Sequence, residues 1–162
     1  TINSTGNATD FGNLSAAAAY VAANSNGTND RAVLGGLYTG SFTNIIEYIT
    51  ISTTGNSVDF GDLTLARSGP FGSSNGPSER AIFGGGYATS AATNTIDYIT
   101  INSTGNAIDF GDLITARLGH GAAGTTTAGL CFAGNPGPLS STEEYTGGTG
   151  SFAELFSVSQ GL

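Results

Sequence analysis

Hydrophobic and polar residues alternate in the stretch Asn94–Gly121, which carries the clearest pattern in the chain. From Ile96 to Ile101 the period is two residues, which suits a β-strand and cannot build one face of a helix. Residues 102–106 are rich in Asn, Ser, Thr and Gly, which favour a chain reversal. A second apolar run follows at 107–113. The stretch therefore predicts an antiparallel hairpin.

This phrase is one of three copies. The landmark glycines Gly6, Gly55 and Gly105 lie 49 and 50 residues apart. Other positions keep the same step: Phe11, Phe60 and Phe110; Asp10, Asp59 and Asp109; Asn13, Asp62 and Asp112. A period near 50 residues is typical of propeller blades or of an open array of repeats.

Each copy holds four short apolar runs, which predict a four-stranded antiparallel unit. In the middle copy the runs are Arg80–Gly85, Asn94–Ile101, Ala107–Leu113 and Ala116–Gly124. A sheet with two partly apolar faces must stack on its neighbours. We therefore expect an all-β protein in which residues 1–148 form about three repeats, and residues 149–162 form a closing or attachment segment. We also expect the recurring Phe60 and Phe110 to be buried.

The alanine-rich segment Ser15–Ala23 has the composition of a helix. Its place in the repeat matches Thr64–Gly72, in which glycine and proline exclude a stable helix. We therefore predict a strand at Ser15–Ala23 and no helix in the fold.

The third copy departs from the other two. Gly129–Gly134 keeps the strand that ends in glycine, while residues 135–138 change the turn that follows. Glu143-Glu144-Tyr145 is aligned here with Ile96-Asp97-Tyr98.

Composition and charge exclude several classes of function. The chain has 26 glycines among 162 residues, no Lys and a net charge of −8, which disfavours nucleic acid and anionic membranes as partners. No stretch reaches the roughly 18 apolar residues of a membrane helix, so we expect no membrane insertion. The single Cys131 allows no internal disulfide and is expected to be a small buried residue.

The order of these motifs resembles the kelch family of β-propellers. The residues that carry the resemblance are the paired Gly84-Gly85, the acid–tyrosine pair Asp97-Tyr98, the aromatic Phe110 and the run Arg117–Gly121. The chain differs in using Phe where kelch repeats usually have Trp, and in having Ala18 where the later copies have Arg.

Two short phrases, Thr127–Asn135 and Ser141–Gly148, look like the kelch-like repeats of marine phage virion and tail-fibre proteins. What that likeness implies is a structural role in a virion or extracellular assembly, with surface recognition as a further possibility.

Two motifs that suggest nucleotide chemistry are rejected. Residues 119–124 spell GxGxxG, but the dinucleotide fingerprint requires a helix after the turn, and none is predicted. Asp-Phe-Gly occurs at 10–12, 59–61 and 109–111, but a kinase requires a lysine, which the chain lacks.

The acid pairs Asp59/Asp62 and Asp109/Asp112 are too few for Ca²⁺, which takes about six to eight oxygen ligands. His120 is the only histidine, and its position in the repeat explains it without chemistry. The sequence therefore predicts no catalytic, cofactor-binding or metal-binding residues.

The function expected from the sequence is a non-enzymatic structural module of a virion or extracellular fibre. The alternative is a propeller that binds cell-surface glycan or a receptor. An enzyme comes third, because the copper site of the kelch-type galactose oxidases needs more than one histidine. Thr1 falls where Thr50 and Thr100 fall, inside a repeat, so we expect a homo-oligomer or adjacent repeats of a longer chain to complete the array.

Overall fold

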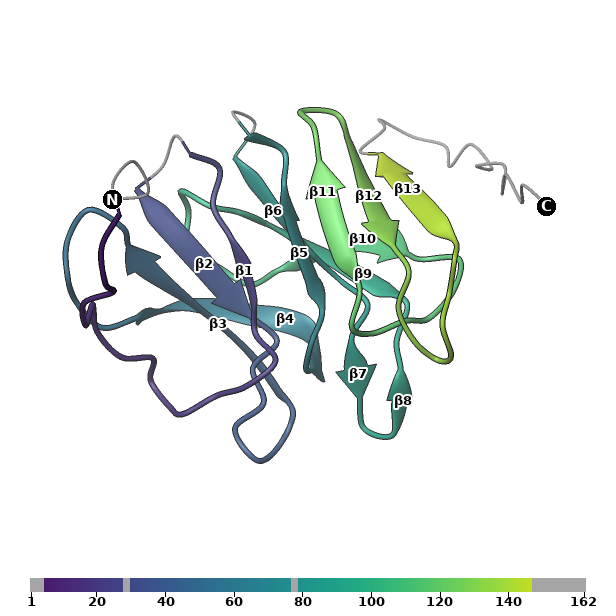
Figure 1. Cartoon of the computed structure of the whole chain (residues 1–162), viewed down its shortest axis with the longest axis horizontal. Helices are drawn as coiled ribbons and strands as arrows, with labels where there is room; N and C mark the ends of the chain where they lie inside the picture. Colours follow the sequence, from purple (N-terminus) through teal and green to yellow (C-terminus); the bar gives the residue numbers. More distant parts are fainter. Residues whose placement is uncertain (1–4, 28–29, 77–78, 147–162) are drawn as a thin grey trace.

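The protein is an all-β chain of antiparallel sheets (Figure 1). This computed structural model describes residues 5–27, 30–76 and 79–146, so the expected closing or attachment segment at 149–162 lies outside the described residues. Within these ranges there is no α-helix, so the all-β prediction is confirmed for the described residues. They also contain no helix long and apolar enough to cross a membrane.

Three sheets follow one another along the chain. The first sheet has the order β1 (Ala22–Asn24), β2 (Arg31–Gly35), β3 (Thr43–Thr50), β4 (Val58–Arg67). The second sheet has the order β5 (Phe71–Ser74), β6 (Arg80–Gly84), β9 (Thr95–Thr100), β10 (Ile108–Asp112). The third sheet has the order β11 (Gly121–Gly124), β12 (Ala128–Phe132), β13 (Thr142–Thr146), and β7 (Tyr87–Ala88) pairs with β8 (Ala91–Ala92) in a small hairpin.

The first strands of the three sheets, β1, β5 and β11, lie next to one another (Figure 1). The later strands of each sheet lead away from this line. Each sheet is thus an up-and-down meander, and the sheets lie face to face in chain order.

The hairpin predicted within Asn94–Gly121 is confirmed. Strands β9 and β10 pair in antiparallel fashion, with Tyr98 opposite Ile108 and Ile96 opposite Gly111. The register shifts between Asp109 and Gly111, so Phe110 sits at a bulge.

The predicted grouping of strands is wrong by one element. The strand expected within Ala116–Gly124 is β11, which pairs with β12 and opens the third sheet. The missing strand of the second sheet is β5, which precedes the other three strands in the chain and pairs with β6. The repeat period gives the length of the unit but not the residue at which one sheet ends and the next begins.

The strand predicted at Ser15–Ala23 is mostly wrong. Only Ala22 and Ala23 belong to β1, and Ala19 makes an isolated bridge with Tyr38. The Ser15 N–H points to the Glu47 carboxylate and not to a neighbouring strand. The rejection of a helix in this segment is confirmed.

The alignment of Glu143-Glu144-Tyr145 with Ile96-Asp97-Tyr98 is also wrong, by one residue. Glu143 pairs with Cys131 as Asp97 pairs with Phe83, whereas Tyr145 pairs with Gly129. A shift of one residue exchanges the two faces of a strand. Tyr145 therefore occupies the place of Ile99 and points into the core.

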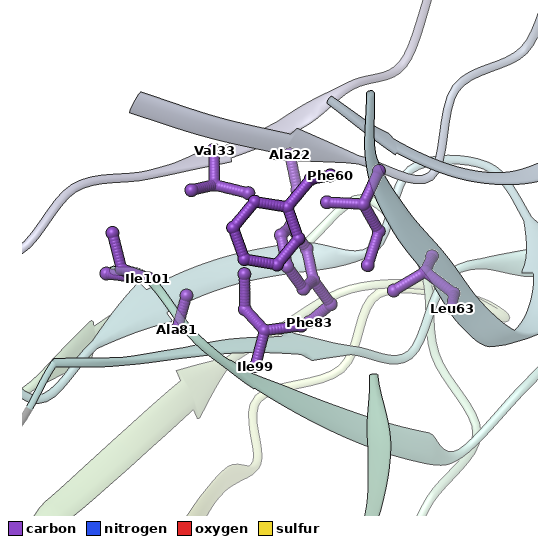
Figure 2. Packing of buried hydrophobic residues seen from close by; sticks show 9 residues of the cluster. Ala22, Val33, Phe60, Leu63, Ala81, Phe83, Ile99 and Ile101 are labelled. Atoms are coloured by element: carbon purple, nitrogen blue, oxygen red, sulfur yellow. The ribbon is translucent and has the colours of Figure 1, made fainter. Parts of the chain in front are cut away.

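A cluster of buried apolar side chains joins the first sheet to the second (Figure 2). Its members are Ala22, Val33, Ile46, Phe60, Leu63, Ala81, Phe83, Ile99 and Ile101. Successive side chains of β6 point to opposite faces of its sheet, so this strand contacts both neighbouring sheets. Ala81 and Phe83 face the first sheet, while Ile82 faces the third.

A second cluster joins the second sheet to the third. It contains Phe71, Ile82, Ile96, Leu113, Cys131 and Tyr145, with Tyr98, Phe110 and Ala122 packed against it. The Phe71 and Tyr145 rings stack with their centroids 5.4 Å apart. The core is thus divided into two layers, one at each contact between sheets.

The recurring phenylalanine is buried to different extents in the three copies. Phe60 is 3% exposed, which confirms the prediction for that residue. Phe110 is only half-buried, and Phe11 is 38% exposed. The aromatic position is therefore fully buried in one of the three copies, and Phe110 borders a pocket between the second and third sheets.

We predict that truncation of this side chain costs stability in the same order. Phe60→Ala should lower the free energy of unfolding by about 3–5 kcal/mol, because it removes a fully buried ring. Phe110→Ala should cost less and Phe11→Ala least. Denaturant unfolding of the three variants at low protein concentration measures the order, and equal losses for Phe60→Ala and Phe11→Ala would contradict it.

Candidate functional site

A buried ion pair connects the first sheet to the second. Arg67, the last residue of β4, donates from Nη2 to Asp97 Oδ2 at 2.9 Å and to the Phe83 carbonyl at 3.0 Å. Both side chains are fully buried. Burial lowers the pKa of Arg67, and the Asp97 carboxylate opposes that shift. Thr64 adds two bonds, from its N–H to Asp97 Oδ2 at 3.2 Å and from its hydroxyl to Oδ1 at 2.5 Å.

The same arrangement connects the second sheet to the third. Arg117 pairs with Glu143, and Nη1 also donates to the Ala133 carbonyl at 2.9 Å. The Glu143 carboxylate accepts the N–H groups of Ile114 at 2.7 Å and Thr115 at 3.1 Å. In both sheets, an acid on the third strand, β9 or β13, therefore accepts hydrogen bonds from the chain segment that precedes the sheet.

The first sheet has the acid without the arginine. Glu47 is 2% exposed and lies at the position of Asp97 and Glu143. It accepts the Ser15 N–H at 3.4 Å, the Ser15 hydroxyl and the Ser57 hydroxyl at 2.8 Å. The position of the arginine is occupied by Ala18, and among the described residues no ion pair to Glu47 is found.

Sequence reasoning missed these carboxylate networks. The absence of Arg from the first copy is visible in the sequence, but it was not connected to an acid that follows 26 to 30 residues later. The joint occurrence of Arg67 with Asp97, and of Arg117 with Glu143, is the signal that could have found the pairs.

The Asp-Phe-Gly triplets have a structural role at the contacts between sheets. The Phe60 carbonyl accepts Gly105 N–H at 2.8 Å, and the Asp62 carbonyl accepts Ala107 N–H at 2.7 Å. At Gly61, φ is +147°, and an added Cβ would collide with the Gly105 carbonyl. The glycine therefore permits a close approach between the backbones of the two sheets.

His120 is a packing residue. Its ring lies 5.0 Å from that of Phe71, and a Cβ on Gly85 would come within 2.8 Å of His120 Cε1. Burial, with a smaller effect from the Arg117 charge, lowers the pKa of His120 to about 4. The imidazole is therefore neutral at physiological pH.

The GxGxxG phrase and Cys131 also have structural positions, the first largely in a strand and the second in the core. Residues 121–124 of the GxGxxG phrase form β11, and the chain turns directly into β12 without a helix. Cys131 is fully buried, and burial raises the pKa of its thiol, which disfavours a nucleophilic thiolate.

The acid pairs Asp59/Asp62 and Asp109/Asp112 lie on the outer strands β4 and β10. Asp59 and Asp109 are exposed, and each is opposite a buried acid, Glu47 or Asp97. Within the described ranges no group of three or more His, Cys, Asp and Glu side chains lies together.

One pocket of about 400 Å³ opens between the second and third sheets. Ser73, Ser74 and the Thr125–Thr127 turn supply hydroxyl groups, and Arg80 supplies a cation. Phe110 and Tyr145 form an aromatic part of the wall. Burial raises the pKa of Tyr145 to about 12, so its phenol remains protonated and can donate a hydrogen bond.

Known proteins give no family to which the chain can be assigned. No family model matches it, and no curated protein matches it.

We predict that neutralising the buried acids has unequal effects. Asp97→Asn should cost about 3–5 kcal/mol, because it leaves the Arg67 guanidinium buried without its counter-charge. Glu47→Gln should cost about 1 kcal/mol or less, because no buried cation loses a partner and the amide can bond to the same hydroxyls.

Chemical denaturation of both variants under one set of conditions measures the difference. The two substitutions are matched, since each replaces a carboxylate by its amide at the same place in the unit. Equal losses would show that Arg67 does not depend on Asp97.

Proposed function

We propose that this chain is a non-enzymatic structural module of a virion or extracellular assembly, such as a phage tail fibre or other surface fibre. Its sheets are kelch-like blades, arranged as a propeller-like or open array. The observation that supports the proposal most is a junction that occurs twice between successive sheets, each time with a buried acid paired to an arginine and with an apolar layer.

The use of the charged residues supports a structural role. Arg67 and Arg117 are engaged in the junctions. Arg31 and Arg80 lie over the rings of Tyr48 and Tyr98, at 4.4 and 4.5 Å from the ring centres. All four arginines of the chain therefore contact the protein itself.

The pocket between the second and third sheets supports a second candidate function. Its hydroxyls, the Arg80 guanidinium and the Phe110 and Tyr145 rings are groups that bind a sugar by hydrogen bonds and by stacking. In this reading the module displays a glycan- or receptor-binding site on the same assembly. A glycan array probed with the purified chain tests this candidate.

We predict that antibodies against the chain label fibres or other surface appendages of the native particle or cell. Immunogold electron microscopy measures this, and antibody absorbed beforehand with the purified chain is the control. Label at the tip of a fibre would favour the binding function, and label along its length the structural one. Label confined to the cell interior would contradict both.

A further inference from the structure

We propose that residues 5–14 of one copy of this chain form the fourth strand of the third sheet in a second copy, in antiparallel pairing with β13. The inference deepens the proposed structural function and rests on it. The partner is a second copy of the same chain, and the template for the contact occurs twice within the chain.

The segment at residues 11–13 makes the contacts of an outer strand. The Phe11 carbonyl accepts Gly55 N–H at 2.9 Å, and the Asn13 carbonyl accepts Ser57 N–H at 2.9 Å. These bonds repeat those of Phe60 and Asp62 to the next sheet.

Two further details agree with this equivalence. The Asn13 N–H bonds to the side chain of Asn56 at 3.0 Å, as Asp62 N–H bonds to that of Asn106 at 3.1 Å. Gly12 has a φ of +149°, against +147° for Gly61, and each would collide with a glycine carbonyl if it carried a Cβ. Residues 11–13 therefore contact the first sheet in the same way as residues 60–62 of β4 contact the second sheet.

The segment 5–14 differs from β4 and β10 in the pairing of its other edge. β4 pairs with β3, and β10 pairs with β9, each within its own sheet. Among the described residues, no strand pairs with 5–14 in that way. At the far end of the array, β13 pairs with β12 on one edge, and no described strand occupies its other edge. Among the described residues, the segment 5–14 and the edge strand β13 thus lie at opposite ends of the array, each with one edge unpaired (Figure 1).

The internal repeats also give the register. Tyr98 lies opposite Ile108, and Asp97 lies opposite Asp109. Glu144 and Glu143 occupy the places of these two β9 residues, and Thr9 and Asp10 occupy the places of their β10 partners. Thr9 of one copy should therefore lie opposite Glu144 of the next, and Asp10 opposite Glu143. An acid opposite an acid is already present at both complete sheets, at Glu47/Asp59 and Asp97/Asp109.

The apolar faces at the two ends are complementary in the same register. On the third sheet Leu130 and Phe132 are 38% and 37% exposed, and Leu130 holds the place of Val33 and Ile82, which face the following sheet. On the first sheet Leu34 and Ile49 are half-buried, and Ile51 is 48% exposed.

These three residues of the first sheet hold the places of Phe83, Ile99 and Ile101, which the preceding sheet buries almost completely. Addition of the strand would bring the two exposed faces together and cover Phe11. The contact between copies is then a third instance of the junction found within the chain.

This junction differs from the internal ones at two places: Glu47 of the first sheet has Ala18 in place of an arginine partner, and one aromatic pair is incomplete. Tyr48/Phe60 and Tyr98/Phe110 make edge-to-face contacts at 6.1 Å. The corresponding pair between copies is Glu144 and Phe11, which lacks the second ring. We therefore expect the copies to associate more weakly than the sheets within a chain and to dissociate on dilution.

Cysteine pairs test both the contact and its register. Thr9→Cys and Glu144→Cys together place two thiols at opposed positions, where antiparallel Cα atoms are about 4.5–5.5 Å apart and a disulfide can close. Both positions are exposed, so the variant should fold. The matched control combines Thr9→Cys with Thr146→Cys, two residues along the same exposed face, where the diagonal distance of about 7–8 Å disfavours the bond.

Oxidation of the double variant should give a ladder of dimers, trimers and longer species on a non-reducing gel, increasing with protein concentration. The off-register control should give at least tenfold less. A cross-linked monomer would show that the chain closes on itself, and a yield no greater than the control would show that β13 is not the partner. Either result overturns the inference, whereas the proposed function is judged separately by the labelling of native particles.

Discussion

A buried carboxylate on the third strand of each unit is the constraint on which the arrangement of sheets depends. Asp97 accepts bonds from Thr64 and Arg67, both in the strand that ends the preceding sheet. A buried charge without partners is costly, so the sheets cannot separate locally without exposing Asp97 to water or stranding Arg67. The acid thus fixes where the chain must pass as it leaves one sheet and enters the next.

The other contacts between sheets follow from that geometry. Gly61 allows the Phe60 carbonyl to approach Gly105, and the apolar layer around Phe83 fills the space between the two sheets. The buried carboxylate and the apolar layer recur at the second junction, whereas the glycine and its carbonyl contacts recur at residues 11–13. A junction made only of residues at repeat positions can be extended by any further copy of the unit.

Sequence patterns predicted the positions of the strands better than their grouping into sheets. Alternation at Ile96–Ile101 gave β9, and the step of 49 to 50 residues gave the equivalence of Phe11, Phe60 and Phe110. Periodicity could not show that β5 and not β11 completes the second sheet, because a repeat has no inherent starting point. The register of Tyr145 was missed for a similar reason: two adjacent glutamates offer two alignments, and only the pairing of Glu143 with Arg117 distinguishes them.

The candidate site was harder to predict from sequence. Motifs such as Asp-Phe-Gly and GxGxxG could be rejected because the helix or lysine that their chemistry needs was missing. The buried pairs could not be predicted in this way, because Arg67 and Asp97 meet only when one sheet packs on the next. The pocket beside Arg80 likewise arises from two sheets, and neither of them alone contains it.

Amide hydrogen exchange at the junctions tests the central role of the carboxylates most directly. The N–H groups of Thr64, Ile114 and Thr115 donate to the carboxylates of Asp97 and Glu143. They should exchange as slowly as the strand amides of β9 and β13, because these bonds open only when the sheets separate. Exchange at the rate of an unstructured peptide, while β9 and β13 stay protected, would contradict the account.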